Sequence, residues 1–286
     1  MTMDTDKIRR AIQEAPLLSA NTSRLMQIMV DPDHAMADVV QLVKVDAVLT
    51  ARLLRIVNSS VFNLLMPVKS VDRAVGYLGE RMVVSLAMAD SVFKMLKKPL
   101  TGYESRPGDL WRHDLFSAFA AREVAGYAKS KLEGDLAYTG GLLHDIGKAI
   151  ISDFLQGTAE RATEGIDRGE KIDYLAAEQE IVGLDHTEVG YELARKWKLP
   201  DPLPHLIRHH HQPSVVDEDL RPLAYAVHLG DIIAMMAGYD TGSDALQYQL
   251  DSSYVEYINF SRDALGEIIL AVGDEFQQEE ESLAVL

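Results

Sequence analysis

The 286-residue chain contains no cysteine. Thiolates are the nucleophiles of cysteine enzymes and the ligands of zinc ribbons and iron–sulfur clusters, and paired cysteines form disulfides, so all of these are excluded. Any metal site in this protein must therefore use histidine nitrogens and carboxylate oxygens.

Basic residues and long apolar runs are also scarce. The chain has 28 Lys and Arg against 44 Asp and Glu, a formal net charge of −16. Broad binding to nucleic acid or anionic lipid is not expected, because both are polyanions. The longest nearly apolar run, residues 222–237, is shorter than the roughly 20 residues of a membrane span. The N-terminus also lacks the apolar stretch of a secretory signal. We expect a cytoplasmic protein without a membrane segment.

The alternation of apolar and polar residues that is typical of strands is missing. Apolar residues instead recur at three- and four-residue spacing, which predicts an all-α protein. We expect Asn21, Thr22 or Ser23 to cap the first helix of the N-terminal half, Asp46 the next and Ser70 the third, which Gly79 ends. Further helices are predicted over residues 83–96, 110–128, 136–154, 174–182, 187–197, 204–210, 220–236, 252–260 and 264–272.

Two prolines, two glycines and mixed charges in residues 99–108 predict a linker. We therefore expect an N-terminal helical bundle over residues 1–98, packed on a second helical subdomain over residues 107–275. Residues 276–286 are predicted to form a charged, solvated tail.

Eight of the nine histidines lie in the second region. Its strongest local feature is the run from Gly140 to Lys148, in which His144, Asp145 and Lys148 interrupt an apolar helix. A buried ionised carboxylate must be paired, hydrogen-bonded or bound to a cation. Metal binding and an ordinary buried His–Asp pair both remain open on this evidence.

Asp231 lies within a second apolar helix, so it also needs a partner. His228 precedes it by three residues on about the same face, and Gly230 allows close approach of another backbone or of a ligand. A hydrogen bond from His228, a lysine or a tyrosine is the structural alternative to metal binding.

Further histidines lie between these two features. His186 is expected in the first turn of a helix that Asp185 caps. His209, His210 and His211 are consecutive, and at least one of them is expected to lie outside any common site, because three adjacent side chains cannot all face one point. Asp109, one helical turn before His113, is a weaker candidate ligand.

Taken in order, these residues resemble the metal-ligand set of the HD phosphohydrolase superfamily, especially its HD-GYP branch. The resemblance covers about residues 107–250 and implies an HD-like helical fold. It implies that metal is bound by His113, His144, Asp145, His186, His209, His210 and Asp231. Lys148 matches a lysine that faces a substrate phosphate in the HD-GYP branch, and the alternative is a stabilising charge beside Asp145.

The first region is similar to the N-terminal half of the HDOD family. The resemblance rests on Pro16-Leu17-Leu18, Asp31-Pro32, the stretch from Val45 to Ser59 and the stretch from Ala74 to Gly79. It spans about residues 6–250 and implies a bacterial signal-transduction output or adaptor protein. Gln212-Pro213-Ser214 follows His211 where HD-GYP enzymes have Gly-Tyr-Pro, so cyclic di-GMP hydrolysis is not supported.

Two functions follow from the resemblance. The first is a non-enzymatic signalling module with a retained metal site, whose N-terminal bundle binds signalling proteins. Asn58, Ser59 and the Arg52 to Arg55 turn belong to this surface or act only as capping and solvated groups. The second is a metal-dependent phosphomono- or diesterase with Asp145 and Lys148 in catalysis, Lys148 and Arg208 on the phosphate, and a phosphorylated or nucleotide ligand.

Mixed imidazole and carboxylate ligands suit Fe, Mn or Zn better than Mg. On the superfamily pattern, we predict one or two ions. His113, His144, Asp145 and Asp231 would hold the first, and Asp145 would bridge to a second, held by His186, His209 and His210. Two metal ions about 3.5 to 4 Å apart can stabilise both the attacking and the leaving oxygen of a phosphoryl transfer.

Overall fold

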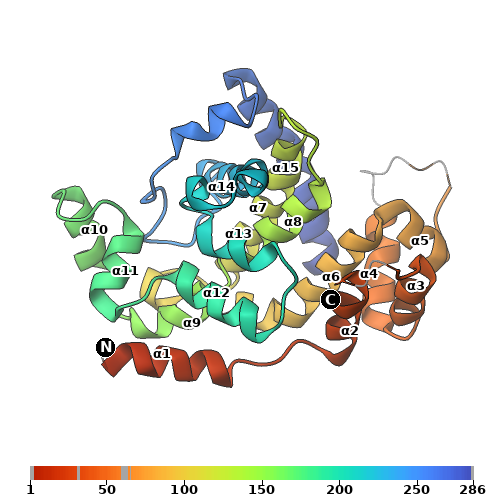
Figure 1. The fold of residues 1–286 in the computed structure, drawn as a ribbon, viewed down its shortest axis with the longest axis horizontal. Helices are drawn as coiled ribbons and strands as arrows, with labels where there is room; N and C mark the ends of the chain where they lie inside the picture. Colours follow the sequence, from red (N-terminus) through yellow and green to blue (C-terminus); the bar gives the residue numbers. More distant parts are fainter. Residues whose placement is uncertain (1–2, 31–32, 59–63, 65, 285–286) are drawn as a thin grey trace. The chain divides into compact units, whose positions relative to one another are not determined.

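The computed structural model describes residues 3–30, 33–58, 64 and 66–284. Over these residues every regular element is a helix, apart from one isolated bridge between Ala128 and Ile258, which confirms the predicted all-α fold (Figure 1). The chain divides into two units. The larger comprises residues 1–16 and 94–272, and the smaller comprises residues 17–93 and 273–286.

The smaller unit is built from α2 (Ala20–Val30), α3 (Met36–Lys44), α4 (Ala47–Val57), α5 (Val71–Leu78), most of α6 (Glu80–Leu96) and the C-terminal part of α15 (Arg262–Ala284). The side chain of Asp46 accepts from Leu49 N, and that of Ser70 accepts from Arg73 N, so both predicted caps are confirmed. The first of these helices starts earlier than predicted, because Ser19 Oγ accepts from the backbone N of Thr22 at 3.0 Å.

Asn58 at the end of α4 has a structural role. Its Nδ2 donates to Val68 O at 2.8 Å, and its Oδ1 accepts from Val68 N at 2.6 Å. These bonds hold the end of α4 to the segment that leads into α5. Ser59, Ser60 and the Asp31-Pro32 pair lie outside the described residues.

The larger unit is centred on α7 (Asp109–Ala125), which packs against α8 (Gly134–Leu143) and α14 (Arg221–Met236). A Cβ on Gly230 would lie 2.7 Å from Ser117 O and 2.8 Å from Ala121 N, so α14 approaches α7 as closely as predicted. Around these helices lie α9 (Lys148–Ile151), α10 (Ala159–Asp167), α11 (Tyr174–Val182), α12 (His186–Lys196) and α13 (Leu203–His209), and five short 3₁₀ helices, η2 (Thr101–Tyr103), η3 (Ser152–Phe154), η4 (Pro213–Val215), η5 (Glu218–Leu220) and η6 (Ser252–Glu256).

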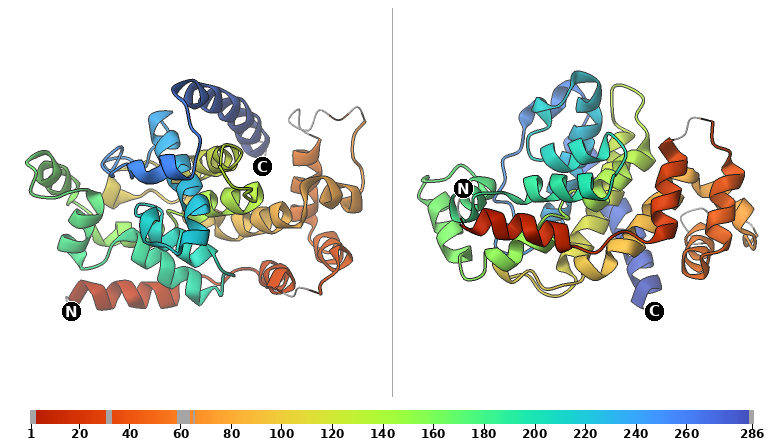
Figure 2. Two further views of the ribbon diagram at one scale, coloured as in Figure 1. Left: turned by 45° about the horizontal axis from the view of Figure 1, so that its top comes forward. Right: turned by 60° about the horizontal axis from the view of Figure 1, so that its bottom comes forward.

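Helix α1 (Met3–Glu14) belongs to the larger unit, although the sequence predicts it in the N-terminal bundle. Figure 1 and Figure 2 show it lying beside α12, and it contacts α12 and α9. Lys196 Nζ donates to the carbonyl oxygens of Ile12 at 3.0 Å, Gln13 at 2.7 Å and Ala15 at 2.6 Å. Because the last carbonyls of a helix have no partner within it, this lysine ties the end of α1 to α12.

The predicted linker, residues 99–108, is packed into the larger unit. Tyr103 in η2 is fully buried and donates to Glu178 at 2.6 Å, and Gly102 N donates to Ser152 Oγ at 3.0 Å.

Near the C-terminus, α15 (Arg262–Ala284) extends through most of the predicted tail. The helix predicted over residues 252–260 is only the 3₁₀ helix η6, followed by the bridge at Ile258.

Candidate metal centre

His144 and Asp145 lie in a tight turn between α8 and α9. The predicted helix over residues 136–154 is interrupted there, since Ile146 N bonds to Leu143 O and Lys148 N to Asp145 O, three residues back instead of four. Gly147 in this turn packs against His186 O, and a Cβ there would also lie 2.6 Å from Gly190 N. Only glycine leaves room for the first turn of α12, which carries His186 to the His–Asp pair.

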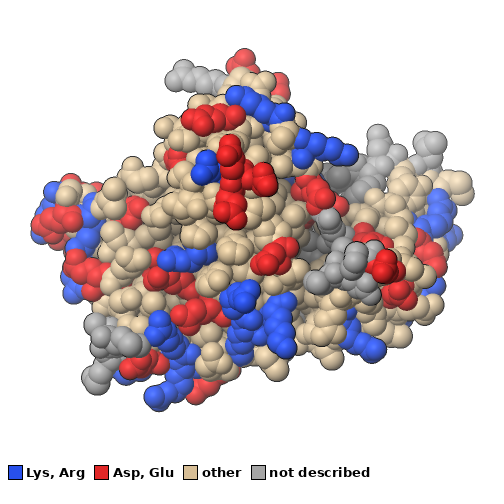
Figure 3. Space-filling model, viewed as in Figure 1, with Lys and Arg blue, Asp and Glu red and all other residues tan. Residues whose placement is uncertain are grey.

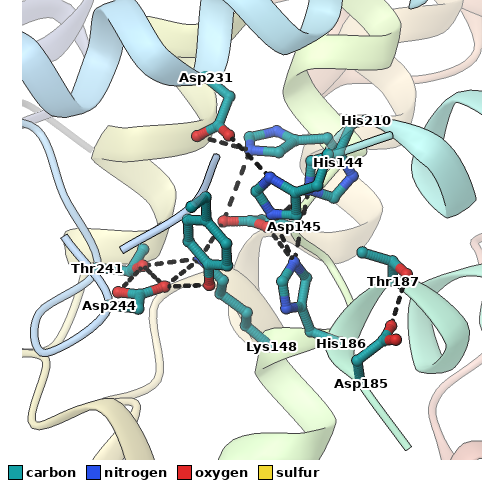
Figure 4. Close-up of polar contacts among 12 residues, drawn as sticks. His144, Asp145, Lys148, Asp185, His186, Thr187, His210, Asp231, Thr241 and Asp244 are labelled. Carbon is teal, nitrogen blue, oxygen red and sulfur yellow. Dashed lines mark hydrogen bonds and ion pairs between the residues drawn. The ribbon is translucent and has the colours of Figure 1, made fainter. Parts of the chain in front are cut away.

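Four further structural elements bring histidines and aspartates to this turn. Figure 4 shows His186, His210 and Asp231 around the His144–Asp145 pair. His113 comes from α7, His186 from α12, and Asp231 from α14, while His210 and His211 directly follow α13. All the side chains of this cluster are buried, with exposed fractions of 0 to 7%: His113, His144, Asp145, His186, His210, His211 and Asp231. The sequence predicted six of these seven residues to lie together.

One half of the cluster consists of His113, His144, Asp145 and Asp231. His113 Nε2 lies 3.2 Å from His144 Nε2, 3.4 Å from Asp145 Oδ2 and 3.2 Å from Asp231 Oδ1. His144 Nε2 lies 3.5 Å from Asp145 Oδ2 and 3.6 Å from Asp231 Oδ1. Neighbouring ligands with metal bonds of about 2.1 Å are separated by about 3.0 to 3.5 Å. The spacing suits one transition-metal ion.

The other half of the cluster uses the second oxygen of Asp145. Asp145 Oδ1 lies 3.3 Å from His186 Nε2 and 3.5 Å from His210 Nε2. His186 Nε2 in turn lies 3.5 Å from His210 Nε2 and 3.2 Å from His211 Nε2. Asp145 therefore faces both halves with one carboxylate oxygen each, as a bridging ligand would.

Four of the imidazoles turn the same ring nitrogen inward. Nδ1 of His113 donates to Tyr239 O at 2.8 Å, Nδ1 of His144 to Gly141 O at 2.7 Å, and Nδ1 of His210 to Ile207 O at 2.9 Å. Nδ1 of His186 faces the carboxylate of Glu178 at 3.0 Å. Because these oxygens only accept, each Nδ1 carries the proton in the neutral ring, and each inward Nε2 keeps a lone pair. Lone pairs 3.2 to 3.5 Å apart repel unless a cation or a proton lies between them.

Three polar atoms of the cluster are buried without a hydrogen-bond partner among the described residues, namely Asp145 Oδ1, Asp231 Oδ2 and His211 Nδ1, whereas Asp145 Oδ2 lies 2.6 Å from Lys148 Nζ. Buried polar groups are almost always paired, and an unpaired charge in the interior is costly. A cation bound by these atoms removes the cost. The donor set is therefore positioned to hold a metal ion.

The electrostatics of the cluster show the same need for positive charge. Burial would raise the pKa of Asp145, yet Lys148 and His144 hold that pKa well below its ordinary value. Burial opposes protonation of His144 and His186, but the nearby carboxylates raise their pKa values to about 9 and about 10. Burial lowers the pKa of His210 to about 4. The carboxylates thus require compensating charge, from protons or from bound cations.

His209, predicted as a ligand, lies outside the cluster, and His211 takes its place. His209 is the last residue of α13 and is half-buried, and burial followed by the charge of Arg208 lowers its pKa. His210 and His211 lie in the turn beyond the helix, where both rings reach Asp145 or Asp231. Successive helical residues point about 100° apart, so only part of a histidine triplet can face one side.

Arg208 and Asp109 also lie apart from the cluster. The Arg208 guanidinium donates to Thr187 Oγ1 at 2.5 Å and to Glu188 Oε1 at 2.9 Å, so it binds the first turn of α12. Its role of holding a phosphate stays a prediction. Asp109 accepts from Arg106 N at 2.8 Å at the start of α7. Neither side chain contacts the candidate metal ligands in the described part of the chain.

Lys148, predicted to face a phosphate, lies inside the cluster but is enclosed. Its Nζ lies 2.6 Å from Asp145 Oδ2, 2.5 Å from Asp244 Oδ2 and 3.0 Å from Thr241 Oγ1 (Figure 4). The side chain is 2% exposed. The alternative considered from the sequence, a charge that stabilises Asp145, describes this geometry.

Three carboxylates near the cluster were not predicted. Glu178 accepts from the backbone N and from Nδ1 of His186, Asp244 pairs with Lys148, and Asp114 lies 3.8 Å from His144 Nδ1. Glu178 and Asp244 are separated from the ligand motifs along the chain, so spacing gave no signal. Asp114 directly follows His113 in an apolar helix, so its carboxylate could have been recognised from the sequence as a buried neighbour of the ligands.

Comparison with known proteins places these features in a family. Residues 15–213 match the HDOD domain. An uncharacterized protein of Treponema pallidum (strain Nichols) is 26% identical over 221 residues, which cover 76% of this chain. The chain spans 41% of the length of that relative.

Solved structures share the fold. An HDOD domain protein of unknown function from Geobacter sulfurreducens has a TM-score of 0.65 at 24% identity, over 95% of this chain and 99% of its own. A candidate signal transduction protein from Marinobacter aquaeolei VT8 has a TM-score of 0.70 at 23% identity, over 96% and 64%. A candidate phosphohydrolase from Shewanella amazonensis SB2B has a TM-score of 0.64 at 23% identity, over 95% and 97%. With the matched HDOD domain covering most of its length, the chain belongs to the HDOD family.

Proposed function

We propose that this chain is an HDOD signal-transduction output or adaptor protein that retains an HD-type metal centre. The observation that supports the proposal is the buried donor set, in which inward Nε2 atoms and carboxylate oxygens form two groups that share Asp145. One of the structural neighbours is itself named for signal transduction.

We infer that the centre takes one or two divalent transition-metal ions, Fe, Mn or Zn, because imidazole and carboxylate donors suit these metals. The first ion would be held by His113, His144, Asp145 and Asp231. The second would be held by Asp145, His186, His210 and His211.

The burial of this centre favours a signalling role over catalysis. The candidate ligands are at most 7% exposed, and the ammonium of Lys148 is already surrounded by protein oxygens. The partners we expect are other signalling proteins, with a phosphorylated or nucleotide ligand as the further class. In the smaller unit, Val45 directly after α3 and Val48 in the first turn of α4 are 79% and 66% exposed and are available to such a protein partner.

A membrane or nucleic-acid function has little support. Among the described helices, none combines the length and apolar character that crossing a bilayer requires. On the face drawn in Figure 3, basic and acidic side chains are interspersed, which does not favour a nucleic-acid surface. A cytoplasmic location stays a prediction.

The alternative function is a metal-dependent phosphohydrolase, and the bridging position of Asp145 favours it. Two ions held on the two oxygens of one carboxylate would supply Lewis-acid stabilisation of a phosphoryl group. In that function Asp145 would orient both ions, while Lys148 would need to exchange a protein carboxylate for the substrate phosphate.

Elemental analysis of protein purified without a histidine tag tests both functions. We expect one or two transition-metal equivalents in the wild type and fewer than half as many in Asp145→Ala, because Asp145 contributes to both halves. The matched control is His209→Ala, which removes a neighbouring imidazole outside the cluster and should keep the full content. The proposal would be contradicted if the purified wild type contains no metal and is as stable as wild type supplied with metal. Under the alternative, the wild type but not Asp145→Ala hydrolyses an aryl phosphate.

A further inference from the structure

The surroundings of Lys148 are complete without any substrate. An ammonium group has three donors, and three oxygens lie within 3.0 Å of Nζ, from Asp145, Asp244 and Thr241. The rings of Tyr103 and Tyr248 also lie 5.5 Å and 5.2 Å from Nζ and close the remaining sides. No donor of Lys148 is left for a phosphate while this arrangement lasts.

Asp244 reaches Lys148 from the segment of residues 237–251, which follows α14. Its carboxylate is 1% exposed and also accepts from Thr241 Oγ1 at 2.8 Å and from Tyr248 OH at 2.8 Å. The same segment covers the cluster at two further points. Tyr239 O accepts from His113 Nδ1 at 2.8 Å, and the Tyr248 ring stacks on His211 with centroids 3.9 Å apart.

The segment is held in place by the polar groups of η2 and α11. Ser243 N donates to Tyr103 O at 2.7 Å, Ser243 Oγ bonds to Tyr174 OH at 2.9 Å, and Tyr174 N donates to Gln247 O at 3.0 Å. These bonds, made by backbone and hydroxyl groups, do not involve the Asp244 carboxylate. Removing only the negative charge of Asp244 should therefore leave the backbone path of residues 237–251 unchanged.

We propose that Asp244 is an internal anion that occupies a phosphate-binding position at Lys148 and keeps the candidate metal centre closed to phosphate esters. The inference rests on the proposed metal centre. A phosphate oxygen and a carboxylate oxygen make the same charge-assisted hydrogen bond to an ammonium group. Asp244 therefore competes with phosphate for Lys148, and its identity decides whether the centre is open to phosphorylated ligands.

The test measures binding of inorganic phosphate to the metal-loaded full chain. Asp244→Asn keeps the shape of the side chain but removes its charge, so phosphate should bind roughly tenfold to hundredfold more tightly than to the wild type, the size of one charge-assisted hydrogen bond. Asp240→Asn is the matched control, since it lies on the same segment, accepts from Gly242 N and does not contact Lys148. It should bind phosphate like the wild type.

Equal phosphate affinity of Asp244→Asn and the wild type, at equal metal content, would overturn the inference. So would tight phosphate binding by the wild type. If the wild type contains no metal, the proposed function is refuted instead. Elemental analysis measures this outcome independently of phosphate binding.

A second measurement does not depend on the variant. Brief acetylation of the native wild type should modify exposed Lys131 and spare Lys148. Peptide mass spectrometry measures the two rates, and the difference between the two lysines should be the same with and without metal. Acetylation of both lysines at similar rates would show that Lys148 is not enclosed and would overturn the inference even if Asp244→Asn does not fold.

Discussion

Glu178 shows how a single residue can set the properties of a metal ligand. Its carboxylate accepts from Tyr103 OH at 2.6 Å and faces Nδ1 of His186 at 3.0 Å, whereas His113, His144 and His210 use backbone carbonyls for the same purpose. An anionic partner fixes the tautomer and makes the opposite nitrogen a stronger ligand. His186 should therefore bind metal more tightly because of Glu178.

We predict that Glu178→Gln weakens metal binding in the half of the cluster that contains His186. A neutral amide polarises the imidazole less, and the loss of an outer-shell partner costs about 10- to 100-fold in metal affinity. Competition with a chromophoric chelator measures this affinity. The control is Glu180→Gln on the same helix, where the carboxylate is 57% exposed and pairs with Lys171. Unchanged affinity in Glu178→Gln would refute the role.

The contact of α7 with α14 brings His113 and Asp231 together at the scale of helices. His113 lies on the α7 face that meets α14, and Asp231 directly follows Gly230, which packs against the backbone of α7 at Ser117 and Ala121. The missing side chain of this glycine lets Asp231 Oδ1 come within 3.2 Å of His113 Nε2.

We predict that Gly230→Ala lowers the free energy of unfolding of the metal-free protein by about 1 to 3 kcal/mol, because the new methyl group overlaps the α7 backbone. Gly266→Ala in α15 is the contrasting change. A Cβ there meets nothing within 4 Å, so the better helix propensity of alanine should raise the free energy of unfolding by about 0.5 to 1 kcal/mol. Denaturant titration measures both. Equal effects of the two changes would mean that the α7–α14 spacing can adjust freely.

For the molecule as a whole, the cluster joins elements that are distant in sequence. Its residues come from α7, the turn after α8, α12, the turn after α13, and α14, all within the larger unit. An ion bound by these elements stabilises only the folded state, since the unfolded chain does not hold the donors together.

We predict that removal of the metal by a chelator lowers the melting temperature. A single ion present at 100 times its dissociation constant contributes about 2.7 kcal/mol, which corresponds to about 5 to 10 °C for a unit of this size. Differential scanning calorimetry with and without chelator checks the shift, and Asp145→Ala, which binds less metal, should show a smaller one. A metal-containing wild type that melts at the same temperature in chelator would contradict the prediction.

Much of the architecture follows from local sequence. Apolar residues spaced three and four positions apart predict the helices that bury one apolar face. Asp46, Ser70 and Asp185 cap their helices because each side chain accepts from a backbone N only three residues further along. The absence of thiols and the order of His113, the His144-Asp145 pair, His186 and Asp231 are likewise properties of the sequence alone.

Only the tertiary structure decided the details of the centre. Which two of three consecutive histidines turn inward depends on where α13 ends against its neighbours. The pairing of Arg208 with Glu188 and of Lys148 with Asp244 joins residues that are 20 or more positions apart. Local patterns specify side-chain periodicity and caps, whereas the partner of a buried charge is selected by long-range packing, because the charge pairs with whichever group the folded chain brings within a few ångströms.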